Sequence, residues 1–444
     1  MTIKEALAKA TDTRECQIGD GVVARTAAIA REQFPTATAA VVVADPRTWK
    51  AAGEQVAQQL AAAGLRVTHH IIEKDGKIFH AEYSYVAEVK AAIVAAGDKV
   101  IPVAAGSGVV NDIVKRSSGE LNIPYMVVAT AASVDGYSSF GASLASPEGA
   151  KQTYPCPAPR AIIADLDIMR TAPREMAAYG FADLMAKSPA GADWILAAEI
   201  GATEWHDDAW HIVQDNLADA IGDADAVARG DSAAMTRFVE GLMFGGFAMQ
   251  AMQSSRPASG AEHMFSHILD MTHHTYKGEL VSHGAQVGVY TLFMTRFHEA
   301  LLAFDMNSLD VEKCVADWRE WDYGGEQLVL DVFKDSQFPL LGVEQSKMKW
   351  QTKDELRATL TDAKARWPQI RERLARQLVP SAEIERRLKA VGAPSRPEEI
   401  GVANDFALKN VRFAMFMRNR YNILDFAFRI GRLDDFARAA AFVM

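Results

Sequence analysis

Apolar and polar positions follow two different patterns along this chain, and the change falls near residue 166. Before it, short apolar runs rich in β-branched residues alternate with stretches of helical periodicity. The runs predict strands at residues 39–45, 66–73, 99–105 and 123–129, and the stretches between them predict helices at residues 49–65 and 81–97. This alternation is typical of a parallel sheet that helices cover on both faces.

After Leu166 the strand pattern almost disappears. Ala, Leu, Met, Glu and Arg recur at helical spacing through to the end of the chain. The pattern therefore predicts an α/β domain at residues 1–168 and a helical domain at residues 169–444.

The composition narrows the class of protein. Of the 444 residues 49% are hydrophobic and 23% charged, and the formal net charge of −10 argues against a nucleic-acid partner. Cys16, Cys156 and Cys314 lie far apart, which favours a reducing compartment over a disulfide framework or a thiolate metal site. Because the chain begins with a polar segment and no apolar run is long enough to cross a bilayer, we expect a cytoplasmic protein.

Small and polar residues follow several of the predicted strands, where parallel sheets bind their ligands. Gly106-Ser-Gly108 could bring backbone amides close to a diphosphate, although a third glycine is absent and Asn111 stands in its place. Asp45 could accept a hydrogen bond from a ribose, or cap a helix that begins at Pro46. The segment 130–136 suits either a polar pocket or a capping turn. The residues alone leave these alternatives open.

Histidines and carboxylates give two candidate metal sites. His263 and His267 are four residues apart and would share one helix face. With Asp183 and His283, His263 would complete a ligand set that leaves a position open for substrate. A second group is almost as well spaced, and its flanking tryptophans favour a structural role; it comprises His206, Asp207, Asp208 and His211.

Several segments occur together, in an order specific to one enzyme superfamily. They are Gly106-Ser-Gly-Val-Val-Asn-Asp-Ile-Val-Lys115, Ile123-Pro-Tyr-Met-Val-Val-Ala-Thr-Ala-Ala-Ser-Val-Asp-Gly136, Ala161-Ile-Ile-Ala-Asp-Leu-Asp167, Gly180-Phe-Ala-Asp-Leu-Met-Ala-Lys187, Ala192-Asp-Trp194, Ser259-Gly-Ala-Glu-His263 and His283-Gly-Ala-Gln-Val-Gly288. Together they resemble the sn-glycerol-1-phosphate dehydrogenase family, within the superfamily of iron-type alcohol dehydrogenases and dehydroquinate synthases. Arg418-Asn-Arg-Tyr-Asn-Ile-Leu-Asp425 resembles the closing helix of the family's bacterial branch.

The resemblance implies a dehydroquinate synthase-like fold, with a Rossmann-like NAD(P)-binding domain, an all-α domain and an active site in the cleft between them. It implies a metal held by Asp183, His263 and His283. Lys187 stands where four-ligand members have a further histidine, so we expect three protein ligands and room for substrate oxygens. That favours zinc or nickel over iron.

The implied reaction is hydride transfer between a nicotinamide cofactor and the central carbon of dihydroxyacetone phosphate. The implied cofactor-binding residues are Asp45, Gly106, Ser107, Gly108, Asn111, Asp112, Thr130 and Ser133. Asp135 would lie near the substrate, His267 would relay a proton or support a ligand, and Lys187 would favour a phosphorylated substrate. We favour NAD over NADP, because Asp45 beside a ribose would repel a 2′-phosphate.

Some departures from the family pattern leave other functions open. Ala182 and Ala129 replace a usual glycine and a usual proline, Pro189 falls in the helix expected to carry Asp183, and the C-terminal region is long. A dehydrogenase of another polyol or sugar-alcohol phosphate is the first alternative. A dehydroquinate synthase-like lyase is the second, and Asp183 counts against it because those enzymes have Glu as first ligand. A non-catalytic protein is the third, although no metal ligand is lost. From the family we expect a homodimer or larger assembly.

Overall fold

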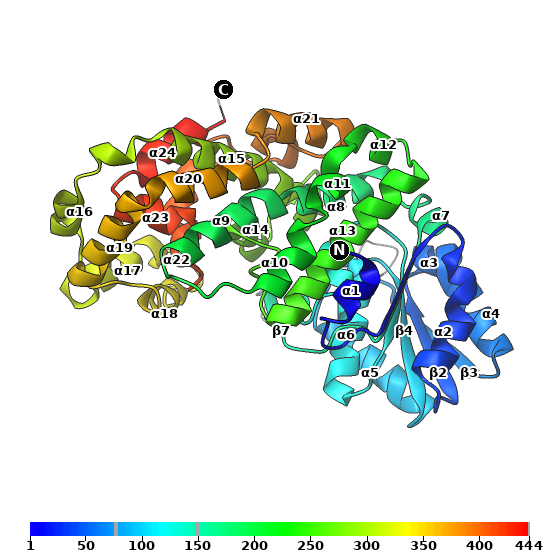
Figure 1. Cartoon of the computed structure of the whole chain (residues 1–444). Coiled ribbons are helices and arrows are strands. Elements are labelled where there is room, and N and C mark those ends of the chain that lie inside the picture. The colour runs from blue at the N-terminus through cyan, green and yellow to red at the C-terminus, as the bar shows by residue number, and fades with distance from the viewer. Residues whose placement is uncertain (75–78, 147–150, 443–444) are drawn as a thin grey trace. The chain divides into compact units, whose positions relative to one another are not determined.

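The computed structural model describes residues 1–74, 79–146 and 151–442, in two compact units (Figure 1). The first, here called the sheet unit, comprises Met1–Leu184, Asp207–Pro257 and Ala390–Ala393. The second, here called the helical unit, comprises Met185–His206, Ala258–Lys389 and Pro394–Met444.

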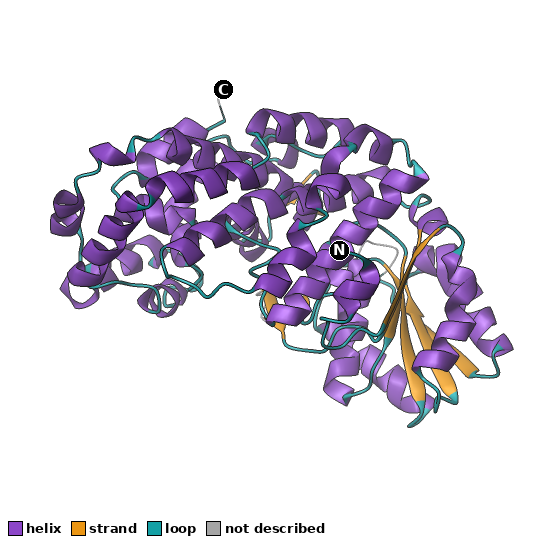
Figure 2. Cartoon of the chain, in the orientation of Figure 1, coloured by secondary structure: helices purple, strands orange, loops and turns teal. Residues whose placement is uncertain are grey.

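A parallel sheet of six strands forms the centre of the sheet unit (Figure 2). The strands run in the order β1-β8-β5-β4-β2-β3. Their bounds are β1 (Glu15–Gly19), β2 (Ala39–Ala44), β3 (Arg66–Ile71), β4 (Val100–Gly106), β5 (Met126–Ala129) and β8 (Ala161–Asp165). The four strands predicted from apolar runs are confirmed. The prediction missed β1 and β8. β1 is an edge strand with one buried residue, Cys16, and has no apolar run, whereas β8 is short and fully buried.

Helices cover both faces of this sheet, as predicted. Every residue of β2 is buried, and alternate side chains of a strand point to opposite faces. Ala40, Val42 and Ala44 belong to a core that includes apolar residues of α2 (Thr26–Gln33) and α4 (Glu54–Ala62). The helices α5 (Ser84–Ala96) and α6 (Gly108–Leu121) pack together, against β2 and β4.

The sheet unit extends beyond the strands. It includes the hairpin β6 (Ala142–Ala145) and β7 (Lys151–Tyr154), the turn η3 (Asp135–Tyr137), and the helices α7 (Leu166–Met169), α10 (Asp207–Gln214) and α13 (Ser232–Met252). It also includes all but the last residue of α8 (Arg174–Met185). The last sheet strand ends at Asp165, close to the boundary expected at residue 168, but residues 207–257 belong to the unit that holds the sheet. The division at 168 therefore stays a prediction.

The helical unit contains the second set of candidate residues. Its central helices are α9 (Lys187–Glu199), α14 (Ala261–Met271), α15 (His283–Ala303), α20 (Trp367–Gln377), α22 (Phe406–Phe416), α23 (Ile423–Arg429) and α24 (Leu433–Ala440). The helix α15 packs against α14 and α24, and Phe265 of α14 stacks on Tyr290 of α15. Pro189 is the third residue of α9, in the first turn where proline is tolerated, so it does not interrupt the helix that carries Asp183.

The hydropathy of the helices gives one further result. Among the described residues, none of the helices combines the length and the apolar character needed to span a membrane.

Candidate functional site

The turn after β4 is shaped by two glycines. Gly106 ends the strand, Ser107 is the N-cap of α6, and Gly108 is the first residue of that helix. A Cβ atom on Gly106 would lie 2.5 Å from Cβ of Val110, and one on Gly108 would lie 2.9 Å from Cγ2 of Val134. Larger residues would therefore push the helix away from the strand. The helix α6 begins at this turn, and the amides of its first turn could bind a phosphate.

Two more predicted cofactor residues lie at the same edge of the sheet, after β2 and β5. Asp45 caps the short helix α3 (Pro46–Thr48), because its Oδ1 accepts hydrogen bonds from the amides of Arg47 and Thr48 at 2.8 and 3.0 Å. Thr130 is buried, and its amide donates to the carbonyl of Gly106 at 3.1 Å. The turns after β4 and β5 are thus bonded to each other.

The remaining residues of α6 hold the loop that follows β5. Asn111 is buried, accepts a hydrogen bond from the Tyr125 hydroxyl at 3.0 Å and donates to the carbonyl of Gly136 at 3.4 Å. Asp112 accepts the amide of Ser143 at 3.2 Å. These contacts are to the protein itself, so a role for Asn111 and Asp112 at the cofactor stays a prediction.

The loop after β5 also contacts the helix that carries Asp183. A Cβ atom on Gly180 would lie 2.1 Å from the carbonyl oxygen of Ala132, so only glycine permits this approach of loop and helix. The Asp135 amide donates to Oδ2 of the buried Asp183 at 3.3 Å. The structure therefore brings together two predicted site residues, Asp135 and Asp183, and one fixes the carboxylate of the other.

Three histidines gather where α14 faces the start of α15. The ring centroids of His263 and His283 are 5.3 Å apart, and His267 lies 6.4 Å from each. His263 is buried, and His283 is partly exposed. The helix spacing of four residues thus places His263 and His267 beside each other, as predicted.

Neighbouring side chains set which nitrogen each ring presents. Nδ1 of His263 lies 2.7 Å from Oε1 of Glu262, a buried carboxylate that can only accept, so Nδ1 carries the proton. Ser266 donates its hydroxyl hydrogen to Oε1 of Gln286 at 2.7 Å, so its oxygen accepts from Nδ1 of His283 at 3.0 Å. In both rings Nε2 is then the nitrogen that would bind a metal.

Sequence reasoning missed Glu262, Ser266 and Gln286. Glu262 precedes His263, and Ser266 and Gln286 each follow a predicted ligand by one helical turn. The signal that could have found them is the requirement that a metal-binding imidazole donates its other nitrogen to an acceptor.

The ligand atoms of the predicted metal set are close to one another. One atom from each of Asp183, His263 and His283 lies within 4.8 Å of the other two, and in the described part of the chain this is the group that could hold a metal ion. In the competing cluster His211 contacts Asp215 at 2.8 Å on an exposed helix face, and Asp208 pairs with Lys9. That cluster does not form such a group among the described residues.

Two further predicted site residues, Lys187 and His267, lie in the helical unit. Lys187 begins α9 and is fully buried, and His267 is partly buried one turn after His263. The catalytic roles of Lys187 and His267 stay predictions.

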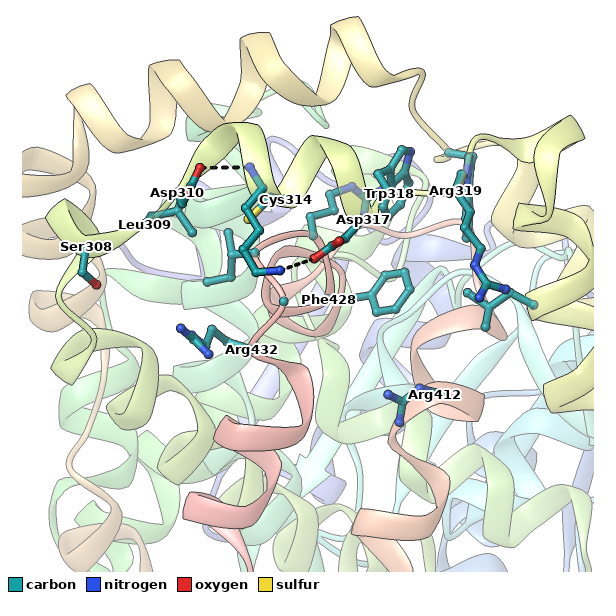
Figure 3. Close-up of a pocket in the computed structure, with 16 residues that line it drawn as sticks. Ser308, Leu309, Asp310, Cys314, Asp317, Trp318, Arg319, Arg412, Phe428 and Arg432 are labelled. Carbon is teal, nitrogen blue, oxygen red and sulfur yellow. Dashed lines mark hydrogen bonds and ion pairs between the residues drawn. The ribbon is translucent and has the colours of Figure 1, made fainter.

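A separate pocket of about 570 Å³ lies in the helical unit, and none of the predicted site residues lines it (Figure 3). Cationic side chains surround it, but acidic ones already pair with them: Lys313 with Asp317, Arg412 with Asp434, and Arg432 with Asp435. These pairs balance part of the positive charge around the pocket, which Arg319 also lines.

Comparison with known proteins identifies the family. The family model for iron-containing alcohol dehydrogenases matches residues 17–173. A glycerol-1-phosphate dehydrogenase [NAD(P)+] of Bacillus velezensis is 33% identical over 252 residues, which cover 56% of this chain and 62% of that protein. The enzyme of the same name from Pyrococcus furiosus is 32% identical over 286 residues, covering 64% of this chain and 78% of that protein.

A solved structure is similar over almost the whole fold. The probable glycerol dehydrogenase from Sinorhizobium meliloti has a TM-score of 0.61 at 16% identity, and the match covers 97% of this chain and 99% of that one. This likeness confirms the predicted fold class. The sequence match spans less than two thirds of the Bacillus velezensis protein but more than two thirds of the Pyrococcus furiosus protein. The chain belongs to the glycerol-1-phosphate dehydrogenase family, within the iron-containing alcohol dehydrogenases, as its motifs predicted.

Proposed function

We propose that this chain is a metal-dependent oxidoreductase that transfers hydride between NAD(P)H and dihydroxyacetone phosphate, giving sn-glycerol 1-phosphate. The observation that carries the proposal is the hydrogen-bonded state of the two histidines. Glu262 and Ser266 contact Nδ1 of His263 and of His283, which supports Nε2 of each ring as the atom that would bind a metal. The relatives are named glycerol-1-phosphate dehydrogenase [NAD(P)+], which supports both the reaction and the cofactor.

The cofactor would bind at the carboxyl edge of the sheet. The amides at the start of α6 would receive the diphosphate, with Gly106, Ser107 and Gly108 leaving room for it and Thr130 and Ser133 beside it. Asp45 uses Oδ1 to cap α3, and no described residue donates to its Oδ2. That oxygen could accept from a ribose hydroxyl, and its charge would disfavour a 2′-phosphate, which supports NAD.

The metal would be zinc or nickel, held by Asp183, His263 and His283. When bound, such an ion polarises the substrate carbonyl as a Lewis acid. The chain's own groups hold the ligands: the amide of Asp135 fixes the Asp183 carboxylate, and Glu262 and Ser266 fix the imidazoles. His267 would pass a proton between solvent and the alcohol oxygen, Asp135 would contact the substrate, and Lys187 would supply positive charge for its phosphate.

The test follows oxidation of NADH and of NADPH with dihydroxyacetone phosphate as substrate. We expect the activity to stop when a chelator removes the metal and to return with zinc or nickel. Unphosphorylated dihydroxyacetone is the matched control, and it should react poorly. Efficient turnover of that ketone or of another polyol phosphate would move the substrate to the first alternative, and activity that survives complete metal removal would contradict the metal role.

Assembly and location also remain proposals. We expect a homodimer or a larger assembly and a cytoplasmic protein. Sedimentation equilibrium of the purified chain would test the first of these.

A further inference from the structure

Asp193 is a buried carboxylate of α9 that lies outside the predicted metal set. It is 1% exposed, and both of its oxygens accept hydrogen bonds from the backbone. Oδ2 accepts the amide of Ala261 at 2.8 Å, and Oδ1 accepts the amide of Ile423 at 2.9 Å. Ala261 and Ile423 are the first residues of α14 and α23, so one side chain holds the beginnings of two helices.

The start of α14 depends on this carboxylate because its own cap is a glycine. Gly260 has no side chain to accept the free amides of the first turn, and none of its neighbours in sequence supplies a side-chain cap. Asp193 supplies the acceptor from another helix, with a negative charge at the positive end of α14. A Cβ atom on Gly260 would lie 2.6 Å from Oδ2 of Asp193 and 2.8 Å from Cα of Ala190, so glycine is needed for the approach.

The same helix turn carries a predicted metal ligand. His263 is the third residue of α14, two positions after Ala261. Oε1 of Glu262 joins the amide of Gly260, at 2.6 Å, to Nδ1 of His263. A displacement of the first turn would therefore move the imidazole with the backbone that supports it.

Asp193 also contacts the helix that carries the second histidine. Its Oδ1 lies 3.3 Å from Nε2 of His298, which is 1% exposed on α15. Neither ring nitrogen of His298 has a hydrogen-bond partner among the described residues, so this carboxylate is its polar neighbour. The helices α9, α14, α15 and α23 thus converge on one acidic side chain.

We propose that Asp193 is a positioning residue for the metal site: it fixes the first turn of α14 and, through it, the direction of Nε2 of His263. The inference rests on the proposed function, because it takes His263 to be a metal ligand. Groups that orient metal ligands typically contribute about 10- to 100-fold in metal affinity.

Asp193→Asn is the first test. The amide side chain keeps one acceptor, but its NH2 group faces the other backbone amide. We expect the affinity for Zn²⁺, measured by competition with a chromophoric chelator, to fall about 10- to 100-fold. The visible absorption bands of the Co²⁺-loaded protein should shift as well, which a purely structural role would not cause.

Asn422→Ala is the matched control. Asn422 caps α23, since its Oδ1 accepts the amide of Leu424 at 2.9 Å, and this substitution loosens the other helix that Asp193 holds without touching α14. We expect it to lower stability and leave the Zn²⁺ affinity and Co²⁺ spectrum unchanged. Equal losses of Zn²⁺ affinity in Asn422→Ala and Asp193→Asn would overturn the positioning role.

Gly260→Ala disturbs the same contact by placing a Cβ atom against Oδ2 of Asp193. It tests the positioning role if Asp193→Asn does not fold. It should weaken Zn²⁺ binding to a similar extent, and the double variant should lose less than the sum of the two single losses, because both remove one contact. If wild type binds Zn²⁺ and both variants bind it equally well, the positioning role is overturned while the proposed function stands. If wild type binds no divalent metal, the proposed function itself fails.

Discussion

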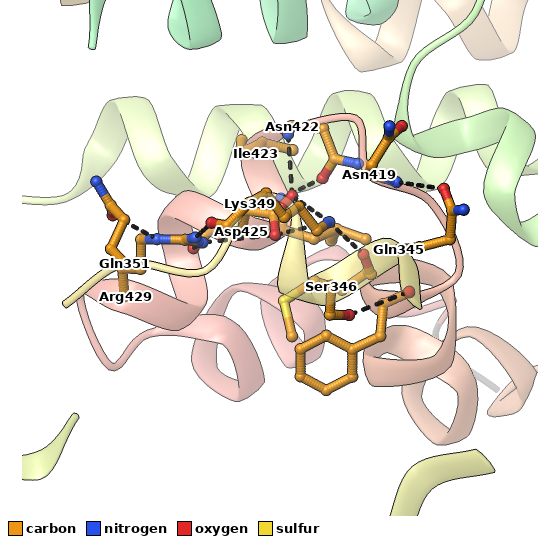
Figure 4. Close-up of polar contacts among 12 residues, drawn as sticks. Gln345, Ser346, Lys349, Gln351, Asn419, Asn422, Ile423, Asp425 and Arg429 are labelled. Atoms are coloured by element: carbon orange, nitrogen blue, oxygen red, sulfur yellow. Dashed lines mark hydrogen bonds and ion pairs between the residues drawn. The ribbon is translucent and has the colours of Figure 1, made fainter. Parts of the chain in front are cut away.

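Two buried polar clusters of the helical unit differ in whether a Lys or Arg pairs with their carboxylate. The first, here called the lysine cluster, consists of Lys349, Gln351, Asp425 and Arg429 (Figure 4). Nζ of Lys349 lies 2.8 and 2.9 Å from the two carboxylate oxygens of Asp425. Arg429 donates to Oε1 of Gln351 at 2.9 Å and to the carbonyl oxygen of Lys349 at 2.6 Å. Its members bond to one another and hold α23 against the segment that contains Lys349 and Gln351, more than seventy residues earlier in the chain.

The second, here called the histidine cluster, consists of Glu262, His263, Ser266, His283 and Gln286. Oε1 of Glu262 accepts two hydrogen bonds, while Oε2 has no hydrogen-bond partner among the described residues although it is fully buried. No Lys or Arg of the described chain pairs with Glu262. A buried carboxylate is costly unless a cation lies nearby, and the residue paired with Glu262 is His263, so we expect this cluster to favour a bound cation.

The difference suggests a general test for buried polar groups. A network that satisfies its own charges acts as a fastener, and its loss should reduce stability alone. A network that holds metal ligands should behave differently, and its loss should reduce metal binding first. Substitutions in the two clusters should therefore affect stability and metal binding differently.

The largest effect is expected from removing a ligand. His263→Ala and Asp183→Ala should each lower turnover at least about a thousandfold, which corresponds to about 4 kcal/mol of transition-state stabilisation. Metal content by elemental analysis should fall with activity, while the circular dichroism spectrum stays that of wild type. His211→Ala, in the competing cluster, is the matched control and should retain both. Wild-type turnover with a full metal complement in either ligand variant would contradict the assignment.

Asp425→Asn should break the lysine cluster and leave the metal site intact. It leaves Lys349 and Arg429 buried without their anion, so we expect the free energy of unfolding to fall by about 3–5 kcal/mol. Asp434→Asn removes a surface partner of Arg412 and should cost less than about 1 kcal/mol. Denaturant unfolding measures both, and a marked loss of Zn²⁺ affinity in folded Asp425→Asn would mean that the clusters are not separate.

Metal binding should stabilise the histidine cluster specifically. At a free Zn²⁺ concentration one hundred times the dissociation constant, the free energy of unfolding should rise by about 2.7 kcal/mol. His263→Ala should lose this increase, while Asp425→Asn should keep it. If zinc stabilised neither wild type nor the control, the cluster would not be a metal site.

Glu262→Gln tests the buried carboxylate directly. The amide is close in size but removes the negative charge behind His263, so Zn²⁺ affinity should fall about 10- to 100-fold. Glu385→Gln, on a partly exposed carboxylate paired with Arg296, is the control and should not change it. An unchanged affinity in Glu262→Gln would show that the charge of this carboxylate is not used by the metal site.

How much of this could be predicted from sequence depends on where the information lies along the chain. The strands β2, β4 and β5 follow from their own apolar runs. The predicted metal set comes from short motifs that contain Asp183, His263 and His283. Asp193 could not be found in this way. It bonds to backbone amides 68 and 230 residues away, and a backbone amide has no residue type that a pattern can detect.

Asp45 and β1 show the same contrast between partners that are close in sequence and partners that are distant. The sequence allowed Asp45 to be either a helix cap or a ribose acceptor. In the structure Oδ1 caps α3, and we propose that Oδ2 accepts from a ribose. The edge position of β1 depends on its pairing with β8, more than a hundred residues later in the chain. Such pairings come from the sheet as a whole and not from the five residues of the strand.

Ser266→Ala should have the smallest effect and gives the finest distinction between site and scaffold. The hydroxyl accepts from Nδ1 of His283 and donates to Gln286, so its loss removes one orienting bond but no charge. We expect Zn²⁺ affinity to fall about fivefold, the value of about 1 kcal/mol for one neutral hydrogen bond. Thr295→Val is the matched control, because its buried hydroxyl donates to the carbonyl of Thr291 in the same helix, at 2.8 Å, and does not contact the histidines. Both should lower stability by similar amounts, so a difference in metal affinity between them would isolate the orientation of His283 from the stability of α15, and equal affinities would mean that the ring needs no such support.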